Sequence, residues 1–496
     1  MTDQTEVVAL LRRLAGREPL ETHISLVFVG SDTVWKLKKA VRLSYLDFST
    51  VEARRRFADR ELALNGFAAP GLYRDVVPVL RQADGSLALG EGGGAPVDWV
   101  LRMARVPEGD FLDAVASAGR LTPALLDAVA DAVAAYHGAL PAVPGTDPAP
   151  ALRQVAEGNA LSAVEAGLPP ADVAAWQEAA LAALDKLSVW LGERAEAGFV
   201  RRAHGDLHLG NLCLWRGKVV PFDALEFDEA LATIDLGYDL ALLLMDLDQR
   251  VDRAAANRVM NRYVARTGDA ALVRGLPAFL SLRAMVRAHV AARSGQRDAA
   301  GRYLRAALGY LRPVPAVVVA VGGLPGTGKS TLARALAPGL GAAPGALVLR
   351  SDEIRKRQNG VAPEQRLPPD AYRSGASKPV FAALAAAARH AAAAGHAVVA
   401  DATFMAPEHR RAIAEAAAGA GVPFVGLWLQ APLAELEARI RGRTGDASDA
   451  TIDVLHAASR NDPGAGAWRP IDATDARQAL HESLAAVRSC MPGPTC

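Results

Sequence analysis

Cysteine, lysine and long apolar runs are all scarce in this chain of 496 residues. The three cysteines fit neither a disulfide framework nor a zinc site, so a reducing compartment is expected. No uncharged apolar run approaches the ~18 residues that a membrane-spanning helix needs. The first residues also lack the basic and apolar regions of a signal peptide. We therefore expect a cytoplasmic protein with no membrane partner.

An excess of charge of either sign is missing too. The 55 basic residues balance the 54 acidic ones, which leaves a formal net charge of +1. Proteins that bind nucleic acid through its phosphates usually carry a basic excess, so small, roughly neutral substrates are favoured as partners and nucleic acid is disfavoured. The length exceeds what one hydrophobic core supports and predicts roughly two to four domains. The sequence does not determine the oligomeric state.

Lysine makes up only a small part of the basic residues, at positions 36, 38, 39, 186, 218, 329, 356 and 378. Arginine is therefore the usual cation of this chain. A lysine that is retained against such a bias is a candidate for a role that a planar guanidinium cannot fill. Three of these lysines follow Trp35 within four residues, and Lys329 lies in a glycine-rich loop.

The sequence Arg-Pro-Val-Pro at 312–315 divides the chain into two regions. Before it, short strand patterns in a small lobe, about 1–105, precede a mainly helical lobe, about 106–311. After it, apolar strands alternate with helical stretches, at 316–322, 346–350, 397–401 and 423–429. Such alternation predicts a doubly wound parallel sheet. We expect one domain at 1–311 and a second at 312–496.

A complete P-loop pattern opens the second region. Residues 323–331 read Gly-Leu-Pro-Gly-Thr-Gly-Lys-Ser-Thr and directly follow an apolar strand. In such a loop the backbone N–H groups surround phosphate oxygens, and the next helix presents its positive end to them. A plain glycine turn is the alternative. The predicted nucleotide-binding residues are Gly323, Gly326, Thr327, Gly328, Lys329, Ser330 and Thr331, with the Ser330 hydroxyl as a Mg²⁺ ligand.

Charged residues follow the next strands, at the sheet edge where doubly wound folds bind ligands. Asp352 is a candidate base for an acceptor hydroxyl, with a helix cap as the alternative role. Arg355 lies one helical turn further on and is a candidate to hold the acceptor or its phosphate. Asp401 ends a later strand and suits Mg²⁺, although a strand-end turn is the alternative.

Arg439 and Arg443 lie one helical turn apart near the end of the region. They are candidates to close over the transferring phosphate, where charge develops, with an exposed arginine face as the alternative. Over about 315–485 these motifs resemble small P-loop kinases: gluconate kinase, polynucleotide 5′-kinase, chloramphenicol phosphotransferase and zeta-toxin-like enzymes. The resemblance implies ATP-dependent phosphorylation of a hydroxyl, with Asp352 as base, Arg355 on the acceptor and either arginine as lid.

A second signature lies in the first region. Residues 204–211 read His-Gly-Asp-Leu-His-Leu-Gly-Asn, which places Asp206 and Asn211 five positions apart in a loop. The spacing matches the protein-kinase catalytic loop, where the aspartate orients the acceptor and the asparagine binds Mg²⁺. Asp223 ends the following strand, the expected place of the main metal ligand. A structural turn is the alternative for this loop, and His204 is interpreted as a loop-stabilising residue.

This loop resembles that of the aminoglycoside phosphotransferase family, whose enzymes have a protein-kinase-like fold. The resemblance implies that Asp206 is the catalytic base and that Asn211 and Asp223 hold Mg²⁺. It also implies that a lysine pairs with the ATP phosphates and that a glutamate on a helix tethers this lysine. One departure from the kinase pattern is that no Gly-x-Gly-x-x-Gly precedes the candidate lysines.

The family pattern favours Lys36 for the phosphate role, and Glu61 as its tether. Lys38 remains the rival, because it lies on the same face of the strand two residues further on. The strand that ends at Met103 would lead into the hinge that holds adenine.

Together the two regions resemble bacterial bifunctional aminoglycoside phosphotransferase/ATP-binding proteins. The expected fold is a multidomain α/β and α+β protein, with a protein-kinase-like fold followed by a P-loop NTPase sheet. The expected function is a tandem phosphotransferase that uses ATP or GTP with Mg²⁺ and acts on alcohol groups of small molecules. The alternative is one active kinase whose other domain is a nucleotide-binding regulatory or ATPase module.

Overall fold

The computed structural model describes residues 3–43, 46–90, 94–372, 374–442 and 447–491. By their contacts the residues form two compact units, Met1–Ala151 with Ser188–Leu243 and Leu152–Leu187 with Leu244–Cys496. Helices on both sides of residue 312 therefore share the second unit. The domain boundary at 311 and 312 remains a prediction from the sequence.

A six-stranded antiparallel sheet begins the first unit, in the order β1-β2-β3-β8-β6-β7. Its elements are α1 (Thr5–Ala15), β1 (Leu20–Glu21), β2 (Ser25–Val29), β3 (Thr33–Lys38), α2 (Val51–Gly66), β6 (Tyr73–Arg81), β7 (Leu87–Leu89) and β8 (Pro96–Ala104), with the separate pair β4 (Arg42–Leu43) and β5 (Leu46–Asp47). Leu37 packs with α1 in a buried cluster on one face. Because side chains alternate along a strand, Lys36 and Lys38 extend from the opposite face, where α2 lies against β6 and β8.

Short helices and hairpins complete the first unit. They are η1 (Glu108–Asp110), α3 (Leu112–Ser117), α4 (Pro123–Ala139), β9 (Val200–Arg202), η2 (Leu209–Asn211), β10 (Leu212–Trp215), β11 (Lys218–Pro221), α7 (Glu229–Ala232) and β12 (Thr233–Asp235). The turn between β10 and β11 has positive φ at Arg216 (51°) and Gly217 (76°), the two-residue geometry that suits a tight hairpin. Leu212 pairs with Pro221 in this hairpin, so its open end brings Asn211 close to the residues that follow β11.

Helices and the C-terminal sheet form the second unit. The helices α5 (Pro148–Glu165), α6 (Pro170–Glu196) and α8 (Leu236–Arg250) contribute residues to both units. The others before residue 312 are α9 (Arg253–Thr267), η3 (Ala270–Arg274), α10 (Leu276–Arg293) and α11 (Arg297–Tyr310). The buried indole of Trp176 donates to Ser281 Oγ at 2.9 Å, and this hydroxyl donates to Ala307 O at 2.7 Å. A polar chain thus joins α6, α10 and α11.

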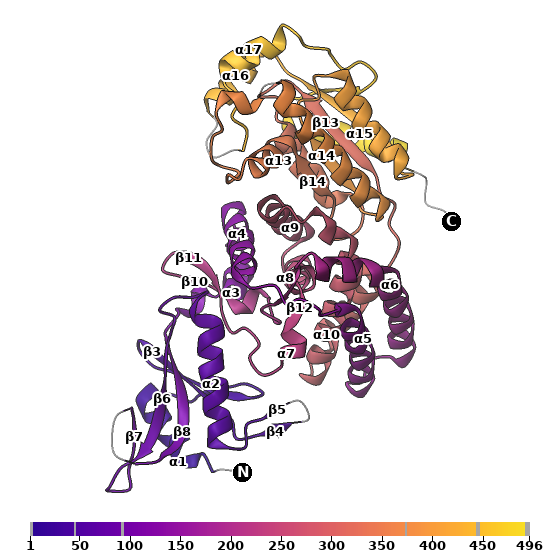
Figure 1. Ribbon diagram of the computed structural model, residues 1–496. Helices are drawn as coiled ribbons and strands as arrows, with labels where there is room; N and C mark the ends of the chain where they lie inside the picture. The colour runs from indigo at the N-terminus through magenta and orange to yellow at the C-terminus, as the bar shows by residue number, and fades with distance from the viewer. Residues whose placement is uncertain (1–2, 44–45, 91–93, 373, 443–446, 492–496) are drawn as a thin grey trace. The chain divides into compact units, whose positions relative to one another are not determined.

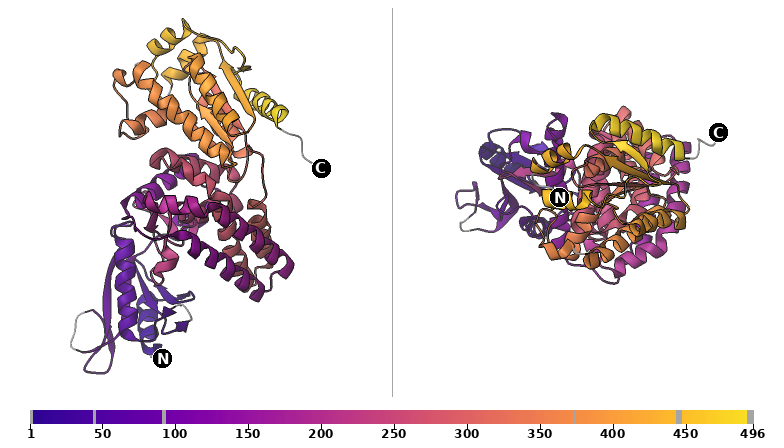
Figure 2. Two further views of the ribbon diagram at one scale, coloured as in Figure 1. Left: turned by 45° about the vertical axis from the view of Figure 1, so that its right-hand side comes forward. Right: turned by 90° about the horizontal axis from the view of Figure 1, so that it is seen from above.

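The C-terminal sheet is parallel, in the order β14-β15-β13-β16-β17. Its elements are β13 (Val318–Gly323), α12 (Lys329–Leu336), η4 (Ala337–Gly339), β14 (Leu347–Arg350), α13 (Ser351–Gln358), η5 (Pro369–Tyr372), α14 (Ser374–Ala393), β15 (Val398–Asp401), α15 (Pro407–Gly419), β16 (Phe424–Gln430), α16 (Leu433–Arg441), α17 (Ile452–Ser459), β17 (Arg469–Asp472) and α18 (Ala476–Cys490). Buried residues of α12 and α18 pack on one face, and α14 and α15 lie on the other (Figures 1 and 2). The predicted α/β and α+β organisation, with a doubly wound parallel sheet, is confirmed. The fifth strand, β17, was not predicted.

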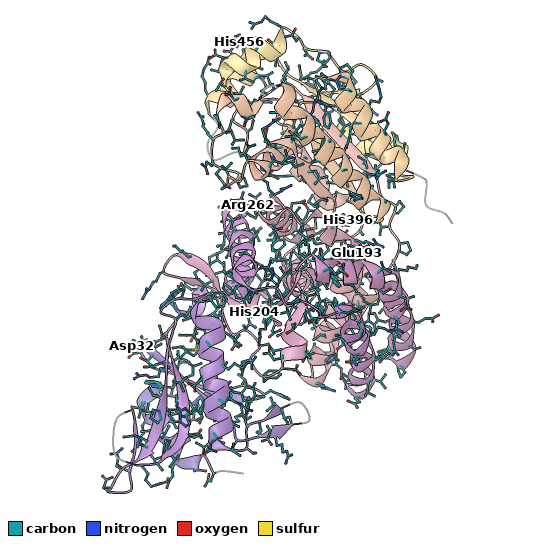
Figure 3. The ribbon with its side chains drawn as sticks, in the orientation of Figure 1. Asp32, Glu193, His204, Arg262, His396 and His456 are labelled. Atoms are coloured by element: carbon teal, nitrogen blue, oxygen red, sulfur yellow. The ribbon has the colours of Figure 1, made fainter. Side chains whose placement is uncertain are left out.

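The outer edge of β14 is covered by α9. The Val348 N–H donates to Asn261 Oδ1 at 2.7 Å, and Asn261 Nδ2 donates to Ala346 O at 3.2 Å. The next residue of α9, Arg262, labelled in Figure 3, forms a 2.6 Å ion pair with Glu364. A side-chain amide therefore satisfies backbone groups that an unpaired strand edge would leave open. Within the described residues, no helix is both long and apolar enough to cross a membrane.

Candidate functional sites

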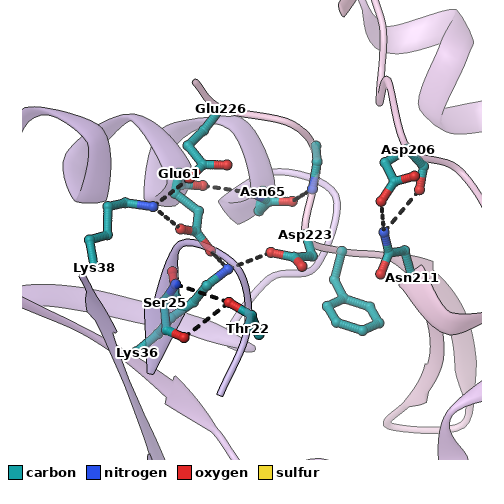
Figure 4. Close-up of polar contacts among 12 residues, drawn as sticks. Thr22, Ser25, Lys36, Lys38, Glu61, Asn65, Asp206, Asn211, Asp223 and Glu226 are labelled. Atoms are coloured by element: carbon teal, nitrogen blue, oxygen red, sulfur yellow. Dashed lines mark hydrogen bonds and ion pairs between the residues drawn. The ribbon is translucent and has the colours of Figure 1, made fainter. Parts of the chain in front are cut away.

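Two acidic residues from distant parts of the first unit meet at Lys36 (Figure 4). Lys36 Nζ donates to Glu61 Oε1 at 2.7 Å and to Asp223 Oδ1 at 2.6 Å. The lysine lies on β3, the glutamate on α2, and the aspartate follows β11. The lysine–glutamate pair that the family resemblance implied is thus present as a contact. The roles of these residues remain predictions.

Lys38 binds the other side of the same glutamate. Its Nζ donates to Glu61 Oε2 at 2.8 Å and to Glu226 Oε1 at 2.5 Å. Sequence reasoning did not single out Glu226, although an acidic residue three positions after Asp223 was a usable signal. Lys36 lines the cavity beside this cluster, whereas Lys38 is buried with Glu226. This placement favours Lys36 for the phosphate role.

The shared carboxylate is held in its charged form. Burial raises the pKa of Glu61, but the ammonium groups of Lys36 and Lys38 outweigh this and bring the pKa to about 2. Burial lowers the pKa of Lys36, but Asp223 and Glu61 outweigh it and the pKa lies well above its usual value. Burial keeps the pKa of Glu226 above its usual value, against the opposing effect of Lys38. At neutral pH the centre of the cluster is therefore ionised.

A cavity of about 610 Å³ opens beside the cluster. Both apolar strand residues and charged residues line it; its walls include Val27, Val34, Lys36, Met103, Asp206 and Asp223. Such a cavity suits a ligand with an apolar ring and a charged end. The structure therefore brings the predicted adenine-side residue Met103 into the same cavity as the predicted catalytic residue Asp206.

The loop that carries Asp206 is anchored by the Asp239 carboxylate. The Asp239 carboxylate accepts the backbone N–H groups of His204 at 3.1 Å and Gly205 at 2.8 Å, and it lies 3.1 Å from His137 Nε2. Burial lowers the pKa of His204, whose Nε2 lies 2.9 Å from Phe222 O. These contacts agree with a loop-stabilising role for His204.

Asn211 closes the loop that carries Asp206 on itself. Its Nδ2 donates to Asp206 O at 2.9 Å and to Asp206 Oδ2 at 3.1 Å, and the Phe222 N–H donates to Asn211 O at 3.0 Å. The Asp206 side chain is 50% exposed, so solvent or a ligand can reach it. Asp206, Asn211 and the start of the Asp223 loop are thus held together.

Asp223 has an unusual backbone conformation. Its φ is +60°, a left-handed value that costs a non-glycine residue about 1–3 kcal/mol when the surroundings enforce it. The Asp223 N–H donates to Tyr73 Oη at 2.9 Å, and the next N–H, of Ala224, donates to Asn65 Oδ1 at 2.9 Å. Contacts from β6 and α2 therefore hold this carboxylate toward Lys36.

Glycine is required at two points of the P-loop. Gly323 has φ +137°, and a Cβ there would lie 2.6 Å from Leu429 O. Gly326 has φ +86°, and a Cβ there would lie 2.8 Å from Leu436 O. The Thr327 hydroxyl and Lys329 Nζ both donate to Leu324 O at 2.8 Å, which closes the loop. The helix α12 then begins at Lys329, so its positive end faces the loop.

Ser330, the second residue of α12, forms a hydrogen bond with Asp401 at the end of β15. Ser330 Oγ donates to Asp401 Oδ2 at 2.5 Å, and Asp401 is 5% exposed. A hydroxyl and a carboxylate are hard oxygen donors of the kind that Mg²⁺ uses together with phosphates and water. The predicted pair thus fits Mg²⁺ by its chemistry. The buried Arg350, which sequence reasoning missed, also contacts both residues.

Asp352 and Arg355 lie on α13, directly after β14. Burial raises the pKa of Asp352, and the cations of Arg350, Lys329 and Arg355 oppose this only in part. Arg355 donates to Ala371 O at 2.8 Å, and its guanidinium lies 4.9 Å from the centre of the Tyr372 ring. Its Nε is buried and has no hydrogen-bond partner among the described residues.

Asp449 binds residues from α13, η5 and the segment between them. It accepts from Lys356 Nζ at 3.1 Å, from the Leu367 N–H at 2.9 Å and from Tyr372 Oη at 2.6 Å. Sequence reasoning did not find this residue. A lone aspartate far from the motifs carries no local signal, because its partners come together only in the folded chain.

The predicted lid arginines are placed unequally. Arg439 on α16 donates to Ala473 O at 2.8 Å and to Glu435 Oε2 at 3.0 Å, so it joins its helix to the segment after β17. Arg443 lies outside the described residues. A lid role for either residue remains a prediction. Thr331, the last predicted P-loop residue, lies exposed on α12.

Comparison with curated proteins gives relatives over nearly the whole chain. Over 471 residues the chain is 28% identical to an uncharacterized protein of Mycobacterium tuberculosis, with 88% of each chain covered. A protein of Mycobacterium bovis that is also described as uncharacterized matches with the same identity and coverage.

Solved kinases are similar to parts of the chain. A gluconokinase from Sinorhizobium meliloti matches 36% of this chain and 95% of its own, at 23% identity and a TM-score of 0.26. A choline kinase from Cryptosporidium parvum matches 62% of this chain and 95% of its own, at 9% identity and a TM-score of 0.39. A thermostable mutant of an aminoglycoside phosphotransferase matches 62% and 98%, at 16% identity and a TM-score of 0.39. In addition, residues 318–461, which hold the P-loop, match the family model described as an AAA domain.

Proposed function

We propose that the chain is a tandem phosphotransferase whose two halves, 1–311 and 312–496, each transfer the γ-phosphoryl group of ATP or GTP to a hydroxyl of a small molecule. The observation that carries this proposal is the meeting of Lys36 with Glu61 and Asp223, which lie 25 and 187 positions away in sequence. Charged residues gathered at a cavity are typical of functional sites.

In the first half, Asp206 accepts the proton of the acceptor hydroxyl. Its exposure on the loop that Asp239 anchors supports this role. Lys36 neutralises the phosphates, and Asn211 with Asp223 holds Mg²⁺. When bound, Mg²⁺ neutralises charge on the phosphate oxygens.

In the second half, Lys329 and the P-loop amides hold the phosphates, and Ser330 with Asp401 holds Mg²⁺. Asp352 is the base, and its raised pKa brings it closer to the pH at which a general base works best. Arg355 contacts the acceptor, for which its unpaired buried Nε, judged within the described residues, is available. The balanced charge of the chain favours a small acceptor over a polynucleotide.

One observation favours a second function for the first half, as a nucleotide-binding regulatory module. The Gly30 N–H donates to Thr33 O at 2.8 Å, so the β2–β3 turn is already closed. A Cβ at Gly30 would lie 2.8 Å from the Trp35 ring. A tight turn of this kind offers fewer free amides to phosphates than a glycine-rich loop.

Separate variants of the two halves test the proposal. Asp206→Asn and Lys329→Ala are each assayed for ADP release with a panel of sugars, nucleosides and amino alcohols, and Lys378→Ala on α14 serves as the lysine control. If both halves are enzymes, each variant is expected to lose one acceptor-dependent activity by about 10²- to 10⁴-fold and to keep the other. Equilibrium titration is expected to give two nucleotides per chain. One nucleotide per chain, unaffected by Asp223→Ala, would reject phosphotransfer by the first half.

A further inference from the structure

Arg350 is the last residue of β14, and its guanidinium reaches three acidic or hydroxyl groups. Nε donates to Asp401 Oδ2 at 3.1 Å, one terminal nitrogen donates to Ser330 Oγ at 3.0 Å, and the other donates to Glu353 Oε1 at 3.0 Å. Arg350 is 4% exposed. A buried cation thus sits on the two oxygen donors proposed for Mg²⁺.

A cation is needed at this position for a physical reason. The Asp401 carboxylate is nearly fully buried, and a buried carboxylate without a positive partner is strongly unfavourable. Arg350 supplies this charge in the structure. A divalent ion on the same carboxylate oxygen would supply it too, and the two cations would repel each other at contact distance.

We propose that Arg350 is a cation that competes with Mg²⁺ for Ser330 and Asp401 of the P-loop site and gives up these two residues when Mg²⁺ and nucleotide bind. This inference rests on the function proposed for the second half. Arg350 is a positioning residue in this account, because it acts through Ser330 and Asp401. Its competition with the metal sets the Mg²⁺ concentration at which nucleotide binds.

Glu353 remains an ion-pair partner for the Arg350 guanidinium after it leaves Asp401. It lies on α13, one residue after Asp352, and its contact with Arg350 does not involve the Mg²⁺ donors. Release of Asp401 therefore need not leave Arg350 as an unpaired charge in the interior. The same link joins the metal site to the helix that carries the proposed base.

The test is a titration of Mg²⁺ against a fluorescent ATP analogue, with the first half silenced by Asp223→Ala in every protein. Arg350→Gln is expected to lower the half-saturating Mg²⁺ concentration about tenfold, because the competing cation is gone. Arg350→Lys keeps the charge but cannot bridge two partners as a guanidinium does, so a smaller decrease is expected. Arg389→Gln, an exposed arginine on α14, is the matched control and is expected to leave the requirement unchanged.

The outcomes separate this inference from the proposed function. An Arg350→Gln protein that folds and has an unchanged or higher Mg²⁺ requirement overturns the competition. If Arg350→Gln does not fold, the same criterion applied to Arg350→Lys decides. If the parent protein binds the analogue at no Mg²⁺ concentration, nucleotide binding by the second half is rejected, and the role of Arg350 is rejected with it.

Hydrogen exchange on the unaltered protein gives a readout without substitution. Nucleotide with Mg²⁺ is expected to change amide exchange in 351–358, since Arg350 then leaves Asp401 and its ion pair with Glu353 on α13 changes. Nucleotide in the presence of a chelator is expected to leave these amides as in the free protein. Equal exchange in both conditions contradicts a metal-driven displacement.

Discussion

Asn261 on α9 forms two hydrogen bonds along the edge of β14. Its Oδ1 accepts the Val348 N–H at 2.7 Å, and its Nδ2 donates to Ala346 O at 3.2 Å. A helix that precedes the P-loop region thus covers the edge strand of its sheet. The same strand ends at Arg350 and leads into α13, so the position of β14 bears on the proposed metal and acceptor residues.

Asn261→Ala is expected to destabilise the second unit by about 1–3 kcal/mol, because it leaves a strand N–H without its partner. Thermal unfolding followed with a nucleotide analogue bound at the P-loop measures this change. Asn461→Ala removes the same amide at an exposed site and is expected to have little effect. Equal stability of the two variants would show that the edge contact contributes nothing.

Glu61→Gln is expected to cost about 3–5 kcal/mol at neutral pH, because two buried ammonium groups lose a shared charged partner. The pKa of Glu61 is about 2 in the folded chain against 4.5 for a free side chain. A lowered carboxyl pKa stabilises the fold above the unfolded value, and this stabilisation is lost as the pH falls from about 4.5 toward 2.

Urea unfolding of the parent and Glu61→Gln proteins at several pH values checks this expectation. The difference in stability should shrink as the pH is lowered through that window. Glu52→Gln, at an exposed position in the first turn of α2, should change stability by only about 0.3–1 kcal/mol, through the helix dipole. A pH-independent difference for Glu61→Gln would contradict the ionised cluster.

The activity of the second half is expected to fall on acidification at a pH above the ordinary carboxyl value of 3.8, since burial raises the pKa of Asp352. The base must be deprotonated to accept a proton. Arg355→Gln removes a cation that lowers this pKa, so the acid limb should move to higher pH. The measurement is the pH dependence of kcat/KM for ADP release in an Asp206→Asn background. An acid limb that stays in place would exclude Asp352 as the titrating base.

Asp449→Ala is expected to loosen the segment 361–372, because Leu367 and Tyr372 lose their acceptor and buried Lys356 loses its carboxylate. Hydrogen exchange of this segment should rise severalfold, and KM for the acceptor should rise more than KM for ATP. Asp449→Asn keeps an acceptor oxygen but removes the charge, so an intermediate effect is expected. Asp453→Ala, at an exposed position on α17, is the control. Unchanged hydrogen exchange of this segment in Asp449→Ala would show that Asp449 does not hold the segment in place.

Local patterns predicted the C-terminal sheet well. Four apolar strands were placed within about two residues of β13, β14, β15 and β16, because buried parallel strands read as continuous apolar runs. The strand β17 was missed since Arg469–Asp472 is short, includes a proline and is mostly exposed. The P-loop was found because its function needs contiguous residues of defined type.

The first half needed more than local pattern. The choice between Lys36 and Lys38 stayed open because both extend from one strand face, and both bind Glu61 in the structure. The loop after β11 separates their surroundings by placing Asp223 beside one lysine and Glu226 beside the other.

By itself the sequence determined where the phosphate-binding loop, the loops that carry Asp206 and Asp223 and four of the five parallel strands lie, because each depends on neighbours within about ten residues. Apart from the Lys36–Glu61 pair, which the family resemblance implied, the tertiary structure alone decided which charges meet. Arg350 reaches Asp401 across 51 positions, and Asp449 reaches Lys356 across 93. Burial makes such pairings obligatory, since a charge removed from water needs an opposite charge nearby, but it does not mark either partner in the local sequence.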